Sequence, residues 1–69
     1  MNIVLNGAPH EVDERVTVAD LVRDISGDRA DGRGMAVAVD AAVVPHSDWA
    51  AVELTEGQRV EVVGAIQGG

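Results

Sequence analysis

The sequence predicts an α+β fold in which about five strands form one mixed sheet that packs on a single helix. Three observations lead to this prediction: an N-terminal hairpin pattern, one stripe of apolar residues at helical spacing, and a second hairpin followed by a closing strand. Two hairpins separated by one helix do not give the alternating βαβ order of doubly wound folds. With 69 residues the chain is long enough for one domain. We expect that domain over residues 1–63 and a flexible tail over 64–69.

The first predicted element is a β-hairpin at the N-terminus. Residues 1–6 alternate, with Met1, Ile3 and Leu5 on one side of an extended chain. Asn6-Gly7 is a dipeptide typical of tight hairpin turns, and a second extended piece is expected over residues 10–12.

A helix of about ten residues is predicted next. Thr17 is a candidate N-cap, Asp20 stands at the capping-box position, and Val16 is placed to contact Leu21 as a hydrophobic staple. Gly27 stands where a left-handed C-terminal cap is expected. The apolar residues with helical spacing are Val18, Leu21, Val22 and Ile25.

The second hairpin follows a glycine-rich stretch, residues 26–34, that lacks periodicity and is expected to be a surface loop. Apolar residues alternate with alanine over residues 35–39, Asp40-Ala41 is a plausible turn, and Val43-Val44-Pro45 makes a short return strand. Proline is expected to end that strand because it cannot donate a backbone hydrogen bond.

The C-terminal third contains a short helical turn and the closing strand. The turn is expected over residues 46–51, with Ser47 as a candidate cap and Trp49, the chain's single aromatic residue, in the core. Glu56-Gly57 turns the chain into a strand over residues 59–63, whose side chains are expected to alternate between the two faces of the sheet.

Composition excludes several classes of function. The chain has no cysteine, no lysine and a formal net charge of −7. The missing cysteine removes disulfides, thiolate nucleophiles and cysteine metal sites, and the missing lysine removes a Walker-type phosphate loop. A strongly acidic protein repels nucleic acid and anionic lipid. The charge either favours partners with an electropositive surface or only keeps a small protein soluble, and the two interpretations are equally good. We therefore expect a soluble, cytoplasmic protein with no nucleic-acid or membrane partner and no bound metal or cofactor.

Side-chain chemistry is sparse. His10 and His46 lie in separate turns or edges, and the carboxylates have the spacing of solvated faces. By contrast, two glycines at the end of a chain occur by chance only about 0.5% of the time. A terminus without side chains can enter a narrow channel and present its carboxylate at a reaction centre. Because a carboxylate is a poor electrophile, chemistry at Gly69 would require activation by a partner enzyme.

The order of elements, together with the Gly68-Gly69 ending, resembles the β-grasp fold of ubiquitin-like proteins. Within that fold the chain is most similar to the ThiS family, the bacterial sulfur carriers of thiamine biosynthesis. The resemblance covers nearly the whole chain. The matching segments are Met1 to Asn6 before Gly7, Thr17-Val18 leading into Leu21, Ala36 to Val39, Val43-Val44-Pro45, Trp49, and Gly57 through Ala65-Ile66-Gln67-Gly68-Gly69.

The resemblance implies that the chain is a protein co-substrate and not an enzyme. A ThiF-like adenylating enzyme would use ATP to adenylate Gly69, and sulfur from a sulfur-donating enzyme would replace the adenylate to give a thiocarboxylate. A ThiG-like thiazole synthase would then receive the sulfur. Gly68, Gln67 and Ile66 would give the terminus access to these enzymes, with Ile66 as an anchor.

Partner enzymes are expected to bind the outward face of the last strand and its neighbours. Val63 and Val4 are the predicted exposed apolar contacts, and Arg59 and Glu61 are predicted to rim them. For Val4 an ordinary isolated surface valine is an equally good interpretation.

Three alternatives remain open from the sequence. The chain is also compatible with a sulfur carrier for molybdopterin or for an amino acid pathway, because such carriers share the fold and the terminal glycine pair. A ubiquitin-like protein modifier, joined through Gly69 to lysines of other proteins, would have the same ending. A plain interaction module, whose sheet edge recruits a partner strand, would make the tail incidental.

Overall fold

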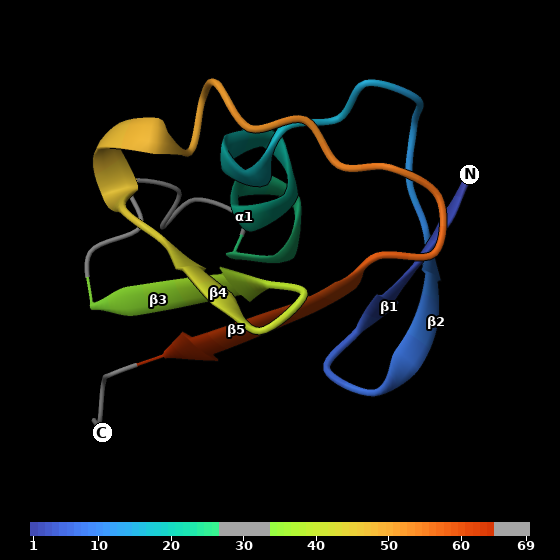
Figure 1. The fold of residues 1–69 in the computed structure, drawn as a ribbon, viewed down its shortest axis with the longest axis horizontal. Helices are drawn as coiled ribbons and strands as arrows, with labels where there is room; N and C mark the ends of the chain where they lie inside the picture. Colours follow the sequence, from blue (N-terminus) through green and yellow to red (C-terminus); the bar gives the residue numbers. More distant parts are fainter. Residues whose placement is uncertain (27–33, 65–69) are drawn as a thin grey trace.

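Figure 1 shows the fold in a computed structural model that describes residues 1–26 and 34–64. Over these residues one five-stranded sheet has the strand order β2-β1-β5-β3-β4, and α1 covers one of its faces. β1 and β5 are parallel, whereas the other neighbouring strands are antiparallel. The predicted mixed sheet packed on one helix is confirmed. The elements are β1 (Asn2–Leu5), β2 (Ala8–Glu11), α1 (Val18–Ser26), β3 (Met35–Val39), β4 (Ala42–Val44), the 3-10 helix η2 (His46–Asp48) and β5 (Arg59–Gly64).

The N-terminal hairpin closes through a turn with two left-handed residues. Asn6 has φ 50° and Gly7 has φ 86°, the conformation that a two-residue type I′ turn requires. β2 pairs with β1 from Leu5 opposite Ala8 to Asn2 opposite Glu11, so it begins two residues earlier than the expected extended piece. The Asn-Gly dipeptide thus locates this hairpin because few other residues tolerate positive φ at both positions.

Reciprocal hydrogen bonds cap the start of α1. The Thr17 N–H donates to Asp20 Oδ2 at 3.1 Å, and the Asp20 N–H donates to Thr17 Oγ1 at 3.1 Å. The first of these bonds is the main cause that lowers the pKa of Asp20 below its ordinary value. The predicted capping box is confirmed, whereas Gly27, the predicted C-cap, lies outside the described residues.

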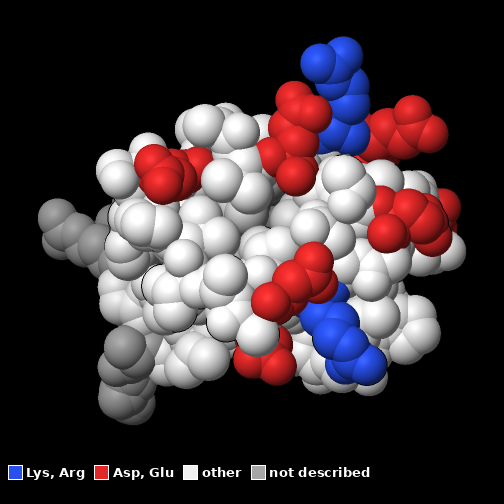
Figure 2. Space-filling view, in the orientation of Figure 1, with Lys and Arg blue, Asp and Glu red and all other residues white. Residues whose placement is uncertain are grey.

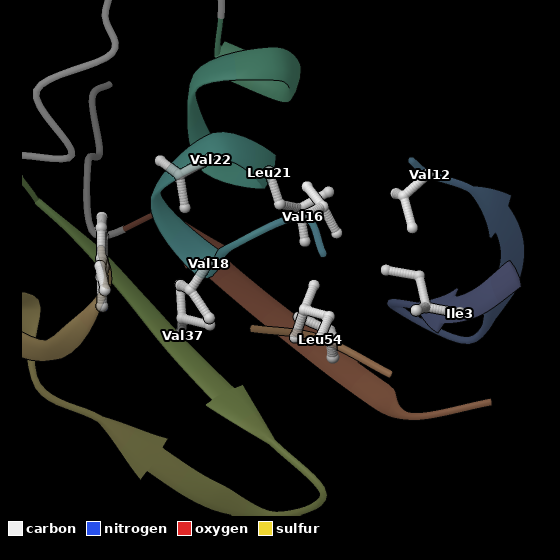
Figure 3. Close-up of a cluster of buried hydrophobic side chains, with 10 residues drawn as sticks. Ile3, Val12, Val16, Val18, Leu21, Val22, Val37 and Leu54 are labelled. Carbon is white, nitrogen blue, oxygen red and sulfur yellow. The ribbon is translucent and has the colours of Figure 1, made fainter. Parts of the chain in front are cut away.

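A hydrophobic core fills the space between α1 and the sheet (Figure 3). Val16 and Leu21 both belong to it, as expected for a hydrophobic staple. Ile25 is 39% exposed, so the predicted helical stripe buries only its first three members. The buried residues are Ile3, Val12, Val16, Val18, Leu21, Val22, Val37, Trp49, Leu54 and Val60.

The second hairpin also turns on left-handed residues, Asp40 at φ 50° and Ala41 at φ 72°. Alanine has no special tolerance for this region, so interactions at Asp40 must hold the turn. Asp40 Oδ1 accepts the Arg59 N–H at 3.0 Å, Oδ2 accepts Gln58 Nε2 at 3.1 Å, and the Asp40 N–H donates to Arg59 O at 2.7 Å. The bond from Arg59 is the main cause that lowers the pKa of Asp40. The turn is thereby joined to the start of β5.

Trp49 follows η2 and is a core residue, as predicted. Its side chain is 6% exposed, and its Nε1 donates to Val44 O at 2.9 Å, which satisfies the polar end of the indole. The prediction that Ser47 caps this turn is wrong. Pro45 occupies the N-cap position without a side-chain cap bond, and Ser47 lies inside the helix.

Thr17→Ala should destabilise the protein, because it removes the hydroxyl that accepts the Asp20 N–H. Loss of an N-cap of this type costs about 1 kcal/mol, which corresponds to a decrease in Tm of about 4–8 °C for a domain of this size. Thermal unfolding followed by circular dichroism measures the effect. Thr17→Ser keeps the hydroxyl and is the matched control, so equal Tm values for the two variants would contradict the role of the cap.

Candidate functional site

The candidate site begins at the C-terminal end of β5, the strand that leads to the terminal glycines. β5 lies between β1 and β3 in the centre of the sheet (Figure 1). The strand ends at Gly64, which pairs with Met35, one residue beyond the predicted end. Gly69 and the predicted tail-access residues Ile66, Gln67 and Gly68 lie outside the described residues.

Side chains of β5 alternate between the core and the surface. Val60 is fully buried and Val62 is partly buried, whereas Arg59, Glu61 and Val63 are exposed. The exposed fraction of Val63 is 61%, which is high for a valine on a central strand. The outer face of β5 therefore presents one apolar side chain, next to the end of the strand, and two charged ones.

We expected Val4 to be an exposed apolar contact. This prediction is wrong, because the side chain of Val4 is partly buried. β1 is flanked on both sides, and the residues in register with Val4 are Pro9 of β2 and Arg59 of β5. Neighbours on both sides reduce the accessible surface of a residue in an inner strand, which leaves Val4 less available to a partner than Val63.

The pairing of β3 with β5 and with β4 places further apolar residues near Val63. Ala36 of β3 is in register with Val63, and Ala38 is in register with Glu61 on one side and Val43 of β4 on the other. Val43 is 75% exposed. We call Val63, Ala36, Ala38 and Val43 the outer strip. Val43 is not among the predicted contact residues, although the period-2 alternation of the second hairpin places it on the face away from the helix.

Charged side chains are distributed unevenly over the molecule. In Figure 2 most of those visible lie over the right-hand part, while the part on the side of β3, β4 and η2 carries few. Two surface hollows beside the start of α1 share the acidic lining residues Asp13, Glu14 and Asp24, and two arginines also line the second. Acidic side chains in open hollows are solvated, so these hollows have no feature that selects a ligand.

The described part of the chain contains no buried polar or charged side chain and no group of three His, Asp or Glu residues placed to hold a metal ion. His10 lies in β2 opposite Ile3, whereas His46 packs against Trp49 with a centroid distance of 4.2 Å and an angle of 37° between the rings, so the two histidines are not brought together. The histidines and carboxylates of the described residues do not form a catalytic constellation.

None of the helices in residues 1–26 and 34–64 has the length and hydropathy to cross a membrane.

Comparison with known families gives a match over almost the entire sequence. The model of the ThiS family matches residues 3–69, a range that includes the last strand and both terminal glycines. The match therefore covers the predicted reactive end as well as the sheet.

Two solved structures are similar to this chain over its whole length. One is the crystal structure of a thiamine biosynthesis protein (ThiS) from Geobacter metallireducens, with 27% identity, a TM-score of 0.80 and complete coverage of both chains. The other is a solution NMR structure of a thiamine biosynthesis protein from the same organism, with 25% identity, a TM-score of 0.80 and coverage of 100% of this chain and 88% of that one. Both structures therefore share the fold of this chain.

A thiazole synthase from Paramagnetospirillum magneticum is 32% identical to this chain over 69 residues. The similarity covers 100% of this chain but only 20% of that protein. The chain thus spans about a fifth of the length of the curated relative it matches.

Proposed function

Because the chain belongs to the ThiS family, we propose that it is a sulfur carrier protein of thiamine biosynthesis on which partner enzymes act. The observation that carries this proposal is the family match from residue 3 to Gly69, which includes the glycine pair. The sequence has no cysteine, so the chain cannot hold sulfur on a thiol, which is consistent with sulfur carriage at the carboxylate of Gly69.

The proposed cycle has two steps at that carboxylate. First, a carboxylate oxygen of Gly69 attacks the α-phosphorus of ATP on a ThiF-like enzyme, which forms an acyl adenylate and releases pyrophosphate. Second, sulfide (HS−) supplied by a sulfur-donating enzyme attacks the acyl carbon, AMP leaves with the bonding electrons of its oxygen, and the new thioacid loses its proton. The product is a thiocarboxylate, which delivers sulfur for thiazole formation. In this proposal the partner adenylating enzyme uses the ATP, the partner enzymes supply the catalytic groups, and the cycle takes place in the cytoplasm.

Five residues follow Gly64 in the sequence. An extended chain of that length spans at most about 17 Å, enough for Gly69 to reach a reaction centre set below a partner's surface. Gly68 and Gly69 have no side chain to obstruct a narrow channel. In this proposal Ile66 anchors the segment and Gln67 continues it.

Thiazole synthase is the partner best supported by the comparisons. The similar segment of the Paramagnetospirillum magneticum thiazole synthase occupies one fifth of that protein. A carrier-like segment within a longer protein of that name supports an association between a carrier and a thiazole synthase. It favours the thiamine pathway over molybdopterin or amino acid pathways for this chain.

The outer strip is the proposed contact surface for these enzymes. It joins the apolar residue nearest the tail, Val63, to the exposed Val43 across the two alanines of β3. Small side chains in its centre allow a partner to approach the sheet closely. Arg59 and Glu61 lie on the same face of β5 and would form a polar rim around the apolar contact.

Removal of Gly69 should abolish adenylation without affecting the fold. We expect AMP formation, measured with the adenylating enzyme, ATP and sulfide, to fall roughly a hundredfold or more, because the shortened carboxylate no longer reaches the α-phosphorus. The Tm and the affinity for the enzyme are the controls, and both should match the full chain. AMP formation at an undiminished rate would contradict the proposed role of Gly69.

Val63→Asp should weaken binding to partner enzymes by roughly tenfold or more, because a carboxylate would be desolvated against an apolar surface. Titration calorimetry with the adenylating enzyme or with thiazole synthase measures the affinity. Ala51→Asp adds the same charge at an exposed position after η2 and should leave the affinity close to that of the unchanged chain. Equal losses in the two variants would mean that net charge, and not the outer strip, governs binding.

A further inference from the structure

The side chain of Asn6 continues the hydrogen bonding between β1 and β5 beyond the point where β1 ends. Residue pairing between the two strands reaches Leu5 opposite Val60, and the Asn6 N–H donates to Val60 O at 2.9 Å. The backbone then turns away through Gly7 into β2. At the next position of β5, the Val62 N–H donates to Asn6 Oδ1 at 2.9 Å, and Asn6 Nδ2 donates to Val62 O at 3.4 Å. One carboxamide thus occupies the place of the next backbone amide of a longer β1.

We propose that Asn6 is a positioning residue for the sulfur-carrying end of the chain, an inference that rests on the proposed function. Asn6 acts through Val62, which precedes the last residue of β5 by two positions. On its other side β5 pairs with β3, with Val37 opposite Val62. With both edges held at this point, β5 keeps one direction up to Gly64. The residues that lead to Gly69 therefore start from a fixed point relative to a docked partner.

The conformation of the turn alone does not explain why residue 6 is an asparagine. Asparagine is favoured at φ 50°, but glycine adopts this conformation equally well. Both polar atoms of the Asn6 side chain bond the two backbone groups of Val62, across 56 positions of sequence. Asn6→Gly therefore keeps the turn and removes only the connection to β5, which separates the two roles.

Loss of this connection should affect the reaction more than docking. Without the carboxamide, one edge of β5 at Val62 exchanges its protein partner for water, and strand ends with such exposed bonds open more readily. The outer strip is unchanged, so KM for the carrier should stay close to the value for the unchanged protein. Because small misplacement of a reacting group is costly, we expect kcat for AMP formation to fall roughly ten- to a hundredfold.

Asp40→Gly is the matched control. Asp40 also has φ 50°, lies in a hairpin turn, and accepts a hydrogen bond from a β5 backbone N–H, that of Arg59 at 3.0 Å. The contact is at the opposite end of β5 from the tail. Both glycine variants lose exposed side-chain hydrogen bonds and should lower the Tm by a few degrees. Only Asn6→Gly should lower kcat.

The experiment measures AMP formation against carrier concentration with the adenylating enzyme, ATP and sulfide, for the unchanged chain and both variants. Amide hydrogen exchange by NMR is measured in parallel, and we expect the Val62 amide to exchange faster in Asn6→Gly alone. Asn6→Asp, which keeps the acceptor for the Val62 N–H but loses the donor to Val62 O, should have an intermediate kcat. This second variant also serves if Asn6→Gly does not fold.

Two results would overturn the inference in distinguishable ways. If the unchanged chain forms AMP and Asn6→Gly retains its kcat, or loses no more than Asp40→Gly, Asn6 does not position the tail and the carrier function stands. If the unchanged chain forms no AMP with an active adenylating enzyme, the proposed function fails and the positioning role fails with it.

Discussion

The last strand of the domain lies in the centre of the sheet, and the other elements are arranged to hold it there. β5 is hydrogen-bonded to β1 in parallel on one side and to β3 in antiparallel on the other. Turns at both ends add side-chain bonds, from Asp40 at the start of the strand and from Asn6 near its end. A strand held in this way is a rigid base for whatever follows it, because its backbone cannot move without breaking bonds on two sides.

The inner face of the sheet and α1 enclose a small apolar core, with Ile3, Leu21 and Val60 among its members. A domain of this size buries only about 60% of the surface that its unfolded chain exposes, so little of the interior is left for polar groups. The described residues indeed contain no buried polar side chain. In the proposed function, the partner enzymes supply the pocket and the catalytic groups.

Local signals in the sequence were sufficient to predict most elements. The Asn-Gly turn, the Thr17–Asp20 capping box and the burial of Trp49 each follow from short-range chemistry, and the structure confirms them. The sequence did not predict the features that depend on residues far apart in the chain. The exposure of Val4 depends on strands that flank it on both sides. The bonds from Asn6 to Val62 join residues far apart in sequence and leave no local pattern.

We propose that Gly69 carries sulfur as a thiocarboxylate. An intact-mass measurement, followed by fragmentation of the C-terminal peptide, tests it after incubation with the adenylating enzyme, ATP and a sulfur donor. We expect the replacement of one oxygen by one sulfur, located at Gly69. An unchanged mass while the enzyme is active, or sulfur located at any other residue, would contradict it.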